Sequence, residues 1–196
     1  LFLAILYYLG VRRGEALGLK WGDFDFAADQ VHILRDIDFT GSTSSEGTLK
    51  TAAADRFIPV PAVLKEMLLP KREAADAFVF HTPSGAPLPQ ASYKRMWSRL
   101  MVACGCVTWR EIKPGTSRPD DILKQVKPTL TSHYFRHNYV TLLYESGVDP
   151  LIAMKIVGHT DYQTTANIYT HLKEETLRRA SVNMEKVFAE REKGGR

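Results

Sequence analysis

The spacing of apolar residues predicts a chain built mainly of helices. Residues 1–9 are almost all apolar and precede Gly10, a pattern that predicts a short buried helix ending at the glycine. In other segments the apolar residues recur about three and four positions apart, as one face of a helix requires. This periodicity predicts helices at residues 16–21, 61–69, 92–104, 131–147, 149–158 and 171–192.

A different pattern appears between residues 24 and 61, where apolar residues alternate with polar ones or are β-branched. Strands are expected at residues 24–26, 31–39 and 56–60, joined in one small antiparallel sheet. The segments 40–55 and 105–127 are rich in turn-forming residues, so we expect a mobile turn and a loop. The predicted fold class is therefore α+β, mainly helical with a small antiparallel sheet.

Composition limits the classes of protein that need to be considered. The chain has 196 residues, of which 44% are hydrophobic, enough for the core of one domain spanning residues 1–196. Its net charge of +4 favours an anionic partner, although charge alone is weak support. The only cysteines, Cys104 and Cys106, do not form the framework of a secreted disulfide protein and are expected to be free thiols in a reducing cytoplasm.

The apolar start of the chain is not expected to act as a membrane anchor or a signal peptide. Residues 1–9 lack a basic leader, and they are far fewer than the roughly 20 residues that a helix needs to cross a bilayer. We therefore expect no membrane partner and treat this segment as part of the core.

Reactive side chains are concentrated between residues 131 and 171. His133 and Arg136 are three positions apart and share one face of a predicted helix, with His137 one turn after His133. His159 directly follows the glycine that ends the next helix, and Tyr169 lies further along. Two nitrogen donors aimed in one direction suit an anion, so this set could surround a single phosphate.

A second candidate group lies near the start of the chain. Arg12 follows Gly10 by two positions, at the junction between two predicted helices, and Glu15 is three positions further on. The planar fork of an arginine matches phosphate oxygens, and Glu15 could hold that arginine or a neighbour in place. The other interpretation is an exposed pair, Arg12 and Arg13, with a local salt bridge to Glu15.

The order of these motifs resembles the signature of the tyrosine recombinases, the phage integrase family. The resemblance is carried by His133-x-x-Arg136-His137, Gly158-His159-Thr and Tyr169-Thr-His171, together with the motif from Gly10 to Trp21. It covers nearly the whole chain, from Leu1 to about the helix after Tyr169, and is closest to integrases of phages and conjugative transposons. It implies the tyrosine recombinase catalytic fold and an upstream core-binding domain. Because the chain starts without Met inside a helical run, we also expect that a preceding segment is missing.

The resemblance also implies a role for each candidate residue. Tyr169 would be the nucleophile, Arg12 and Arg136 would bind the phosphate, His133 would accept the proton of the tyrosine, His159 would be a further donor, and Glu15 would support the arginines. Lys50 would be the general acid, because the Leu49-Lys50-Thr51 context resembles that of the lysine on the family's β-hairpin. A solvated loop lysine is the other interpretation of Lys50. The scheme needs no metal or other cofactor.

The implied activity is site-specific cleavage and rejoining of double-stranded DNA through a 3′-phosphotyrosine intermediate, to integrate or excise a mobile element. The implied partners are DNA, further copies of the chain (a tetramer on DNA in the resembled family), and accessory excision or host factors. Residues 171–192 would form a C-terminal helix that docks on an adjacent protomer. A bacterial or phage-encoded enzyme of this kind would act in the cytoplasm.

Three other functions use some of the same residues. A type IB topoisomerase would apply much the same chemistry to relax DNA, and a non-cutting DNA-binding protein would keep the scaffold alone. A metal hydrolase could use His133 and His137 as ligands, although the zincin pattern requires Glu directly after the first His, where this chain has Tyr134. That hydrolase would be inhibited by chelators, whereas the tyrosine mechanism would not.

Overall fold

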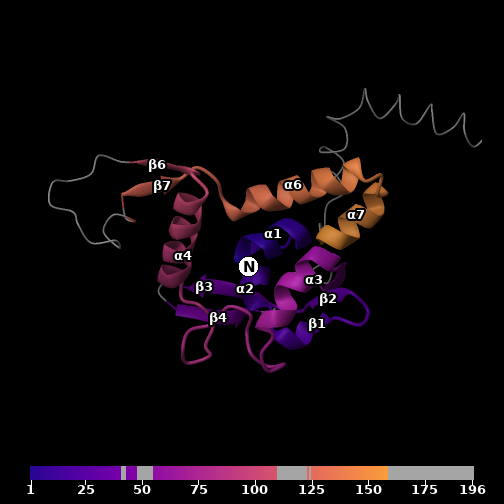
Figure 1. Cartoon of the computed structure of the whole chain (residues 1–196), viewed down its shortest axis with the longest axis horizontal. Coiled ribbons are helices and arrows are strands. Elements are labelled where there is room, and N and C mark those ends of the chain that lie inside the picture. The colour runs from indigo at the N-terminus through magenta and orange to yellow at the C-terminus, as the bar shows by residue number, and fades with distance from the viewer. Residues whose placement is uncertain (41–42, 48–54, 110–122, 124, 159–196) are drawn as a thin grey trace, which may run out of the picture.

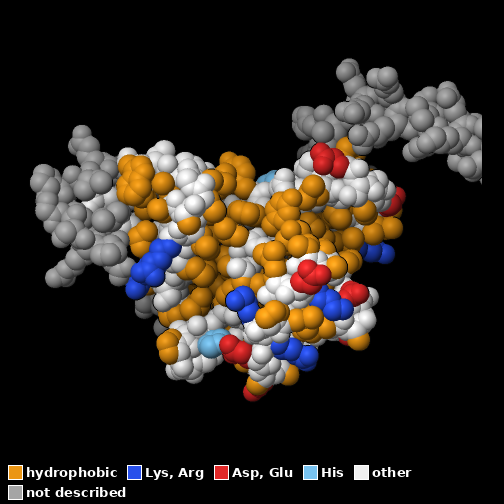
Figure 2. All heavy atoms as spheres, viewed as in Figure 1, with side chains coloured by type: hydrophobic (Ala, Val, Ile, Leu, Met, Phe, Trp, Pro, Cys, Tyr) orange, Lys and Arg blue, Asp and Glu red, His pale blue; other side chains and the backbone are white. Residues whose placement is uncertain are grey.

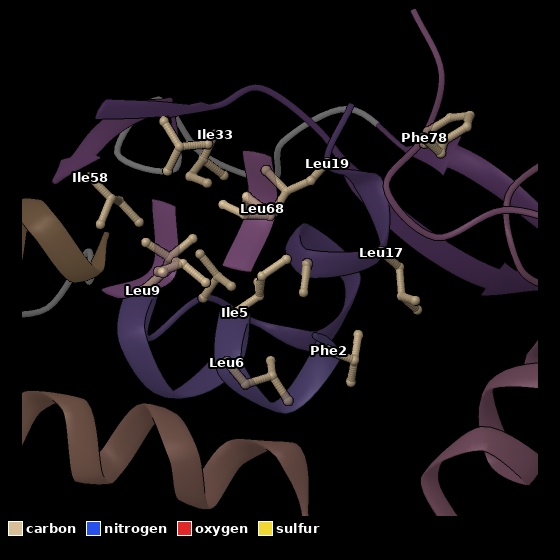
Figure 3. Close-up of a cluster of buried hydrophobic side chains, with 14 of the residues drawn as sticks. Phe2, Ile5, Leu6, Leu9, Leu17, Leu19, Ile33, Ile58, Leu68 and Phe78 are labelled. Atoms are coloured by element: carbon tan, nitrogen blue, oxygen red, sulfur yellow. The ribbon is translucent and has the colours of Figure 1, made fainter. Parts of the chain in front are cut away.

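A buried helix, α1 (Phe2–Leu9), lies at the centre of the protein (Figure 1). The computed structural model describes residues 1–40, 43–47, 55–109, 123 and 125–158. Four side chains of α1 are at most 3% exposed, namely Phe2, Ile5, Leu6 and Leu9 (Figure 3). Because α1 contacts helices α2, α3 and α6, it is covered on several sides, which explains why its sequence is apolar all round.

The helices occupy most of the predicted segments. The α-helices are α1, α2 (Arg13–Gly18), α3 (Ala62–Leu68), α4 (Gln90–Ala103), α6 (Ser132–Glu145) and α7 (Pro150–Val157), and the 3-10 helices are η1 (Trp21–Asp23) and η3 (Leu69–Lys71). The predictions for residues 1–9, 61–69, 92–104, 131–147 and 149–158 are confirmed. The helix predicted at 16–21 starts earlier and ends at Gly18. The segment 171–192 lies outside the described residues.

The described strands form three small antiparallel sheets. Strands β1 (Phe24–Asp25), β2 (Gln30–Ile33) and β5 (Arg56–Pro59) form one sheet in the order β1-β2-β5, β3 (Asp36–Thr40) pairs with β4 (Thr43–Gly47), and β6 (Val107–Trp109) pairs with β7 (Val126–Pro128). In the register of the first sheet, Val31 lies opposite Ile58, and both are fully buried. This sheet therefore contributes its apolar face to the core.

The prediction of one strand at residues 31–39 is wrong, because the chain turns between β2 and β3 and the two strands join different sheets. Arg35, at this turn, donates to the Asp23 carboxylate over 2.7 Å and to the Gly18 carbonyl over 3.1 Å. These bonds fix the turn to α2 and η1. Alternating apolar residues carry no sign of such an interruption, since it is made by contacts distant in sequence.

The loops predicted at residues 40–55 and 105–127 are also partly wrong. Residues 43–47 form β4, whose Ser- and Thr-rich sequence pairs with β3 through the backbone and has little apolar content to mark it as a strand. Strands β6 and β7 pair antiparallel near the two ends of the second segment, and β7 extends one residue beyond it, to Pro128. Residues 48–54 lie outside the described part of the chain, so the remainder of the first prediction is not tested.

Three helix ends, one of α1 and both of α7, are defined by their caps. Gly10 follows α1 in the left-handed conformation, with φ +60°, and its N–H donates to the Leu6 carbonyl over 3.1 Å. At the start of α7, the Asp149 carboxylate accepts from the N–H groups of Leu151 and Ile152. Gly158 closes the other end of α7, again left-handed. The two glycines fix where α1 and α7 stop. This matters because the candidate site lies at the C-terminal ends of these two helices.

The surface carries no single basic region on the face drawn in Figure 2, where Lys and Arg side chains lie in separate groups among apolar side chains. Net charge alone therefore does not mark a binding surface on this face. Within the described ranges, no helix has both the length and the apolar character that crossing a bilayer requires.

Replacing Gly10 with alanine is expected to lower the free energy of unfolding by roughly 2–4 kcal/mol. The left-handed backbone disfavours any Cβ, and a Cβ at this position would overlap the ring of Tyr139. Urea unfolding followed by tryptophan fluorescence measures the loss. Gly147→Ala is the control, because Gly147 is also left-handed (φ +72°) but its added Cβ would meet no atom within 4 Å. Equal losses in the two variants would exclude the Tyr139 contact as the cause.

Candidate active site

Arg12 and Arg136 lie together, although they come from opposite ends of the described chain. Arg12 precedes α2, and Arg136 projects from α6. Both side chains, with that of His133, border one pocket of about 280 Å³. The side chain of Arg12 is 41% exposed, whereas Arg136 is 2% exposed. The first can reach a ligand from solvent, and the second forms the floor of the same site.

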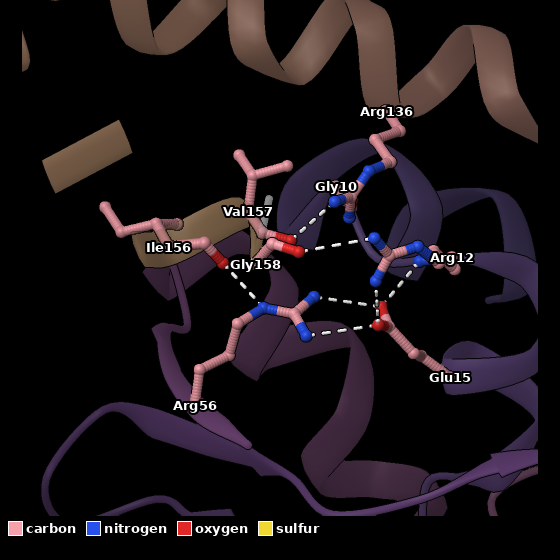
Figure 4. Close-up of polar contacts among 8 residues, drawn as sticks. All are labelled: Gly10, Arg12, Glu15, Arg56, Arg136, Ile156, Val157 and Gly158. Carbon is pink, nitrogen blue, oxygen red and sulfur yellow. Dashed lines mark hydrogen bonds and ion pairs between the residues drawn. The ribbon is translucent and has the colours of Figure 1, made fainter. Parts of the chain in front are cut away.

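Three arginines bind the last carbonyls of α7 (Figure 4). The Ile156 carbonyl accepts from Nε of Arg56 over 2.8 Å, the Val157 carbonyl from Nη2 of Arg136 over 2.6 Å, and the Gly158 carbonyl from Nη2 of Arg12 over 3.2 Å. Carbonyls at a helix C-terminus lack partners further along the helix and form the negative end of its dipole. Cations therefore suit this position, and the three bonds bring β5, α6 and the start of α2 together.

Glu15 is the anion at the centre of this group and is 1% exposed. Its Oε1 accepts from Nη1 of Arg12 and Nη1 of Arg56, and its Oε2 accepts from the backbone N–H of Arg12 and Nη2 of Arg56. Burial, the largest single influence, raises the pKa of Glu15, but the hydrogen bonds and charge of Arg56, with the Arg12 backbone and Arg136, lower it below its ordinary value. Glu15 is therefore ionised at neutral pH and holds two arginines at once.

Arg136 is charged although its side chain is almost completely buried. Besides Val157, it binds the Gly10 carbonyl through Nη1 over 3.0 Å. Burial, the largest cause, and the charges of Arg12 and Arg56 lower the pKa of Arg136, Glu15 raises it, and the net result is a pKa of about 9. A pKa of about 9 still leaves the guanidinium charged at pH 7. An anion in the pocket would relieve the repulsion that Arg136 experiences from the other two arginines.

His133 borders the pocket from α6, one turn before His137. The two imidazole rings are 4.7 Å apart at 87°. The pKa of His133 is lowered, first by burial and then by the charges of His137, Arg136 and Arg12. At neutral pH the ring is therefore mostly neutral and can accept a proton.

The adjacent Arg13 has different partners from Arg12. Its guanidinium lies over the rings of Phe39 and Tyr93, at 4.9 and 5.2 Å from their centroids. Aspartates of β3, Asp36 and Asp38, also line the pocket, and sequence reasoning did not single them out. Their carboxylates place negative charge at one wall, opposite in sign to the arginines.

Arg56 is the principal residue that sequence reasoning missed. Along β5, Phe57 is 59% exposed and Ile58 is buried, so the alternation places Arg56 on the buried face, where it is 7% exposed. A charged residue at an inward position of a strand must have a partner. That alternation is the signal that could have identified Arg56, although it would not have named Glu15 as the partner.

Three predicted site residues, Lys50, His159 and Tyr169, lie outside the described part of the chain, so their positions stay predictions. Gly158, which binds Arg12, is the last described residue before His159. Among residues with a described placement, no group of three or more His, Cys, Asp or Glu side chains is arranged to hold a metal ion.

Replacing Glu15 with glutamine is expected to cost about 3–5 kcal/mol of folding stability at pH 7, since it leaves buried arginines without their counter-ion. The pKa of Glu15 lies below 4.5 in the folded chain, so the carboxylate's contribution is complete above about pH 4.5 and is lost as pH falls through the lower, folded-state value. The difference in urea midpoint between wild type and Glu15→Gln should be constant from pH 7 to 5 and narrow in more acidic solution.

Glu46→Gln is the matched control, because Glu46 pairs with Lys20 at the surface and its side chain is 47% exposed. Its replacement should cost less than about 1 kcal/mol at any of these pH values. If the difference in urea midpoint between wild type and Glu15→Gln stayed unchanged down to pH 3, Glu15 would not be an ionised, buried carboxylate.

Comparisons with known proteins identify the family and the fold of this chain. A family model described as "Phage integrase family" matches residues 1–176. Among curated proteins, the "Tyrosine recombinase XerC-like" of Caldanaerobacter subterraneus subsp. tengcongensis is 26% identical, with 88% of this chain and 45% of that protein covered. The "Integrase" of Staphylococcus phage L54a is 28% identical, with 91% and 49% covered. The chain thus spans about half the length of these relatives.

Solved structures share the architecture. The Tn1549 transposon integrase in complex with circular intermediate DNA has a TM-score of 0.66 at 22% identity, covering 95% of this chain and 57% of that chain. The XerH recombinase bound to difH substrate, in a pre-cleavage complex, has a TM-score of 0.56 at 23% identity, covering 92% and 44%. These likenesses confirm the predicted fold class. Because the family model spans 176 of the 196 residues, the chain belongs to the phage integrase family.

Proposed function

We propose that this chain is the catalytic domain, residues 1–196, of a site-specific recombinase that cleaves and rejoins DNA through a 3′-phosphotyrosine intermediate. The observation that carries the proposal is the meeting of Arg12 and Arg136 at one pocket. Within the hydrogen-bonded cluster of Figure 4, three guanidiniums face one carboxylate, a surplus of two positive charges (3 − 1). Family membership and the names of the relatives, which are recombinases and integrases, support the same conclusion.

A DNA phosphodiester resists attack because its negative charge repels nucleophiles and its alkoxide is a poor leaving group. Arg12 and Arg136 would donate to the non-bridging oxygens and offset the charge that grows in the transition state, with His159 as a further donor. Loss of one such donor typically lowers the rate by about two to three orders of magnitude. Glu15 would keep Arg12 aligned from behind.

Tyr169 would be the nucleophile. Its phenol, with an ordinary pKa of about 10, would lose its proton to His133 as the oxygen attacks phosphorus. The lowered pKa of His133 supports this role, because the neutral imidazole is the form that accepts a proton. As the bond from phosphorus to the 5′ oxygen breaks, Lys50 would protonate that oxygen. Attack of a 5′ hydroxyl from another strand on the phosphotyrosine reverses these steps without ATP.

The proposed reaction requires DNA and partner proteins. The partners are double-stranded DNA and further copies of the chain, with residues 171–192 docking on an adjacent protomer and accessory excision or host factors assisting. Integration or excision of a mobile element is the expected outcome. A bacterial or phage-encoded enzyme that acts on chromosomal DNA would work in the cytoplasm. The DNA complexes among the solved relatives support DNA as the substrate.

Wild-type protein is expected to form an SDS-resistant adduct with a nicked suicide duplex, because loss of the short 5′-hydroxyl fragment traps the phosphotyrosine. The probe is a pool of duplexes with randomised bases around the nick, which requires no chosen recognition sequence, and with a 5′ label on the cleaved strand. Tyr169→Phe should abolish the labelled adduct and leave DNA binding, measured by gel shift, within about threefold of wild type.

Tyr162→Phe is the matched control, since it removes a phenol seven positions earlier in the same segment. Its adduct yield should equal that of wild type. If Tyr169→Phe also retained full yield, Tyr169 would not be the nucleophile.

Chelation separates the recombinase from the metal hydrolase that His133 and His137 could form. Because arginines supply the positive charge in the proposed chemistry, 10 mM EDTA should change the rate of adduct formation by less than about twofold. A hydrolase would lose activity with EDTA, regain it with added Zn²⁺, and release cut DNA with no protein attached.

A further inference from the structure

Arg56 is a buried cation, and it is not one of the described residues that line the pocket. It occupies the first position of β5, on the face that also carries the fully buried Ile58. An unpaired charge at such a place would strongly destabilise the folded chain, so the fold must supply partners. The partners of Arg56 indicate its role.

Its guanidinium is held from two directions. Nη1 and Nη2 donate to the two oxygens of Glu15 over 3.1 and 2.9 Å, the parallel arrangement that fixes both groups in one plane. Nε donates to the Ile156 carbonyl over 2.8 Å, next to the carbonyls that bind Arg136 and Arg12. Arg56 thereby links Glu15 to the end of α7.

Glu15 in turn is shared between two arginines. The same carboxylate oxygens that accept from Arg56 also accept from the side chain and the backbone N–H of Arg12, each over 2.8 Å. A carboxylate that is divided in this way orients Arg12 but offsets only part of its charge. If Arg56 were removed, the full carboxylate charge would fall on Arg12 and weaken its attraction for a phosphate.

We infer that Arg56 is a positioning residue for the pocket: it holds Glu15 so that the carboxylate aligns the guanidinium of Arg12 without neutralising it. Arg56 touches neither substrate nor reacting atoms in this scheme and acts through Glu15 and the end of α7. The catalytic part of the inference rests on the proposed function, whereas the effect on Arg12 does not.

The first measurement is single-turnover adduct formation with saturating nicked duplex. Arg56→Gln should slow the reaction roughly 10- to 100-fold, the range known for partners that orient metal ligands, and leave the Kd for DNA within about threefold. Arg56→Lys keeps the charge but loses the paired hydrogen bonds, so its rate should lie between wild type and Arg56→Gln. The double variant Glu15→Gln, Arg56→Gln should be no slower than Glu15→Gln, because both changes break one chain of contacts.

Arg35→Gln is the matched control. Arg35 also binds a buried carboxylate and a backbone carbonyl, those of Asp23 and Gly18, and neither of these borders the pocket. Both Arg35→Gln and Arg56→Gln should lower the urea midpoint, but only Arg56→Gln should slow adduct formation at a temperature where both are folded. If the two variants were slowed alike, Arg56 would be structural only, and the inference would be wrong.

The second measurement needs no DNA cleavage. Inorganic phosphate is titrated into the purified chain while the arginine Nε–Hε resonances are followed by NMR. The Arg12 signal should shift with the same midpoint in wild type and Arg35→Gln, and with a midpoint at least about threefold higher in Arg56→Gln. Arg56→Lys again gives the intermediate case and covers the possibility that Arg56→Gln does not fold.

The two measurements separate the inference from the function on which its catalytic part rests. Suppose that wild type forms no adduct, but that the phosphate concentration at the midpoint of the Arg12 shift is higher in Arg56→Gln than in wild type. Then the recombinase proposal fails and the positioning of Arg12 by Arg56 stands. If wild type forms the adduct and Arg56→Gln matches Arg35→Gln in both measurements, the function stands and the inference is overturned.

Discussion

The attachment of three arginines to the end of helix α7 is the interaction on which the rest of this site depends. The carbonyls of Ile156, Val157 and Gly158 each accept from a different guanidinium. These arginines come from a strand, a helix and a junction that are far apart in sequence, so one helix end fixes the relative placement of all three. Gly10 and Gly158 end α1 and α7 in left-handed turns, and Arg136 links the two helix ends by binding the Gly10 and Val157 carbonyls.

Such a concentration of like charge is tolerated only because its compensation is specific. The helix dipole, three backbone carbonyls and the carboxylate of Glu15 each offset part of it, and together they keep Arg136 ionised although it is 2% exposed. The compensation is incomplete within this cluster, where three guanidiniums meet one carboxylate, and two of those guanidiniums, Arg12 and Arg136, border the pocket together with Asp36 and Asp38. Folding stability and attraction for an anion therefore depend on the same few side chains, and Glu15 serves both.

The sequence was informative where one periodicity extends over a whole element. The helices were predictable because apolar spacing persists for several turns and glycines stop it, and Arg12 and Arg136 were identified by the order of family motifs. Strand β4 was missed because backbone pairing rather than apolar side chains defines it. Arg56 was missed because a single arginine in a strand forms no motif, and its partners include a backbone carbonyl that has no signature in sequence. Lys50, His159 and Tyr169 remain predictions.

The carbonyls at the end of α7 have a further consequence for recognition. A long, free arginine loses about 2 kcal/mol of rotamer entropy when a ligand immobilises it. Here the rotamers of Arg12 and Arg136 are already selected within the folded chain by the Gly158 and Val157 carbonyls. An incoming phosphate would then meet ordered guanidiniums instead of ordering mobile side chains, so that much of the entropic penalty of binding is incurred when the protein folds.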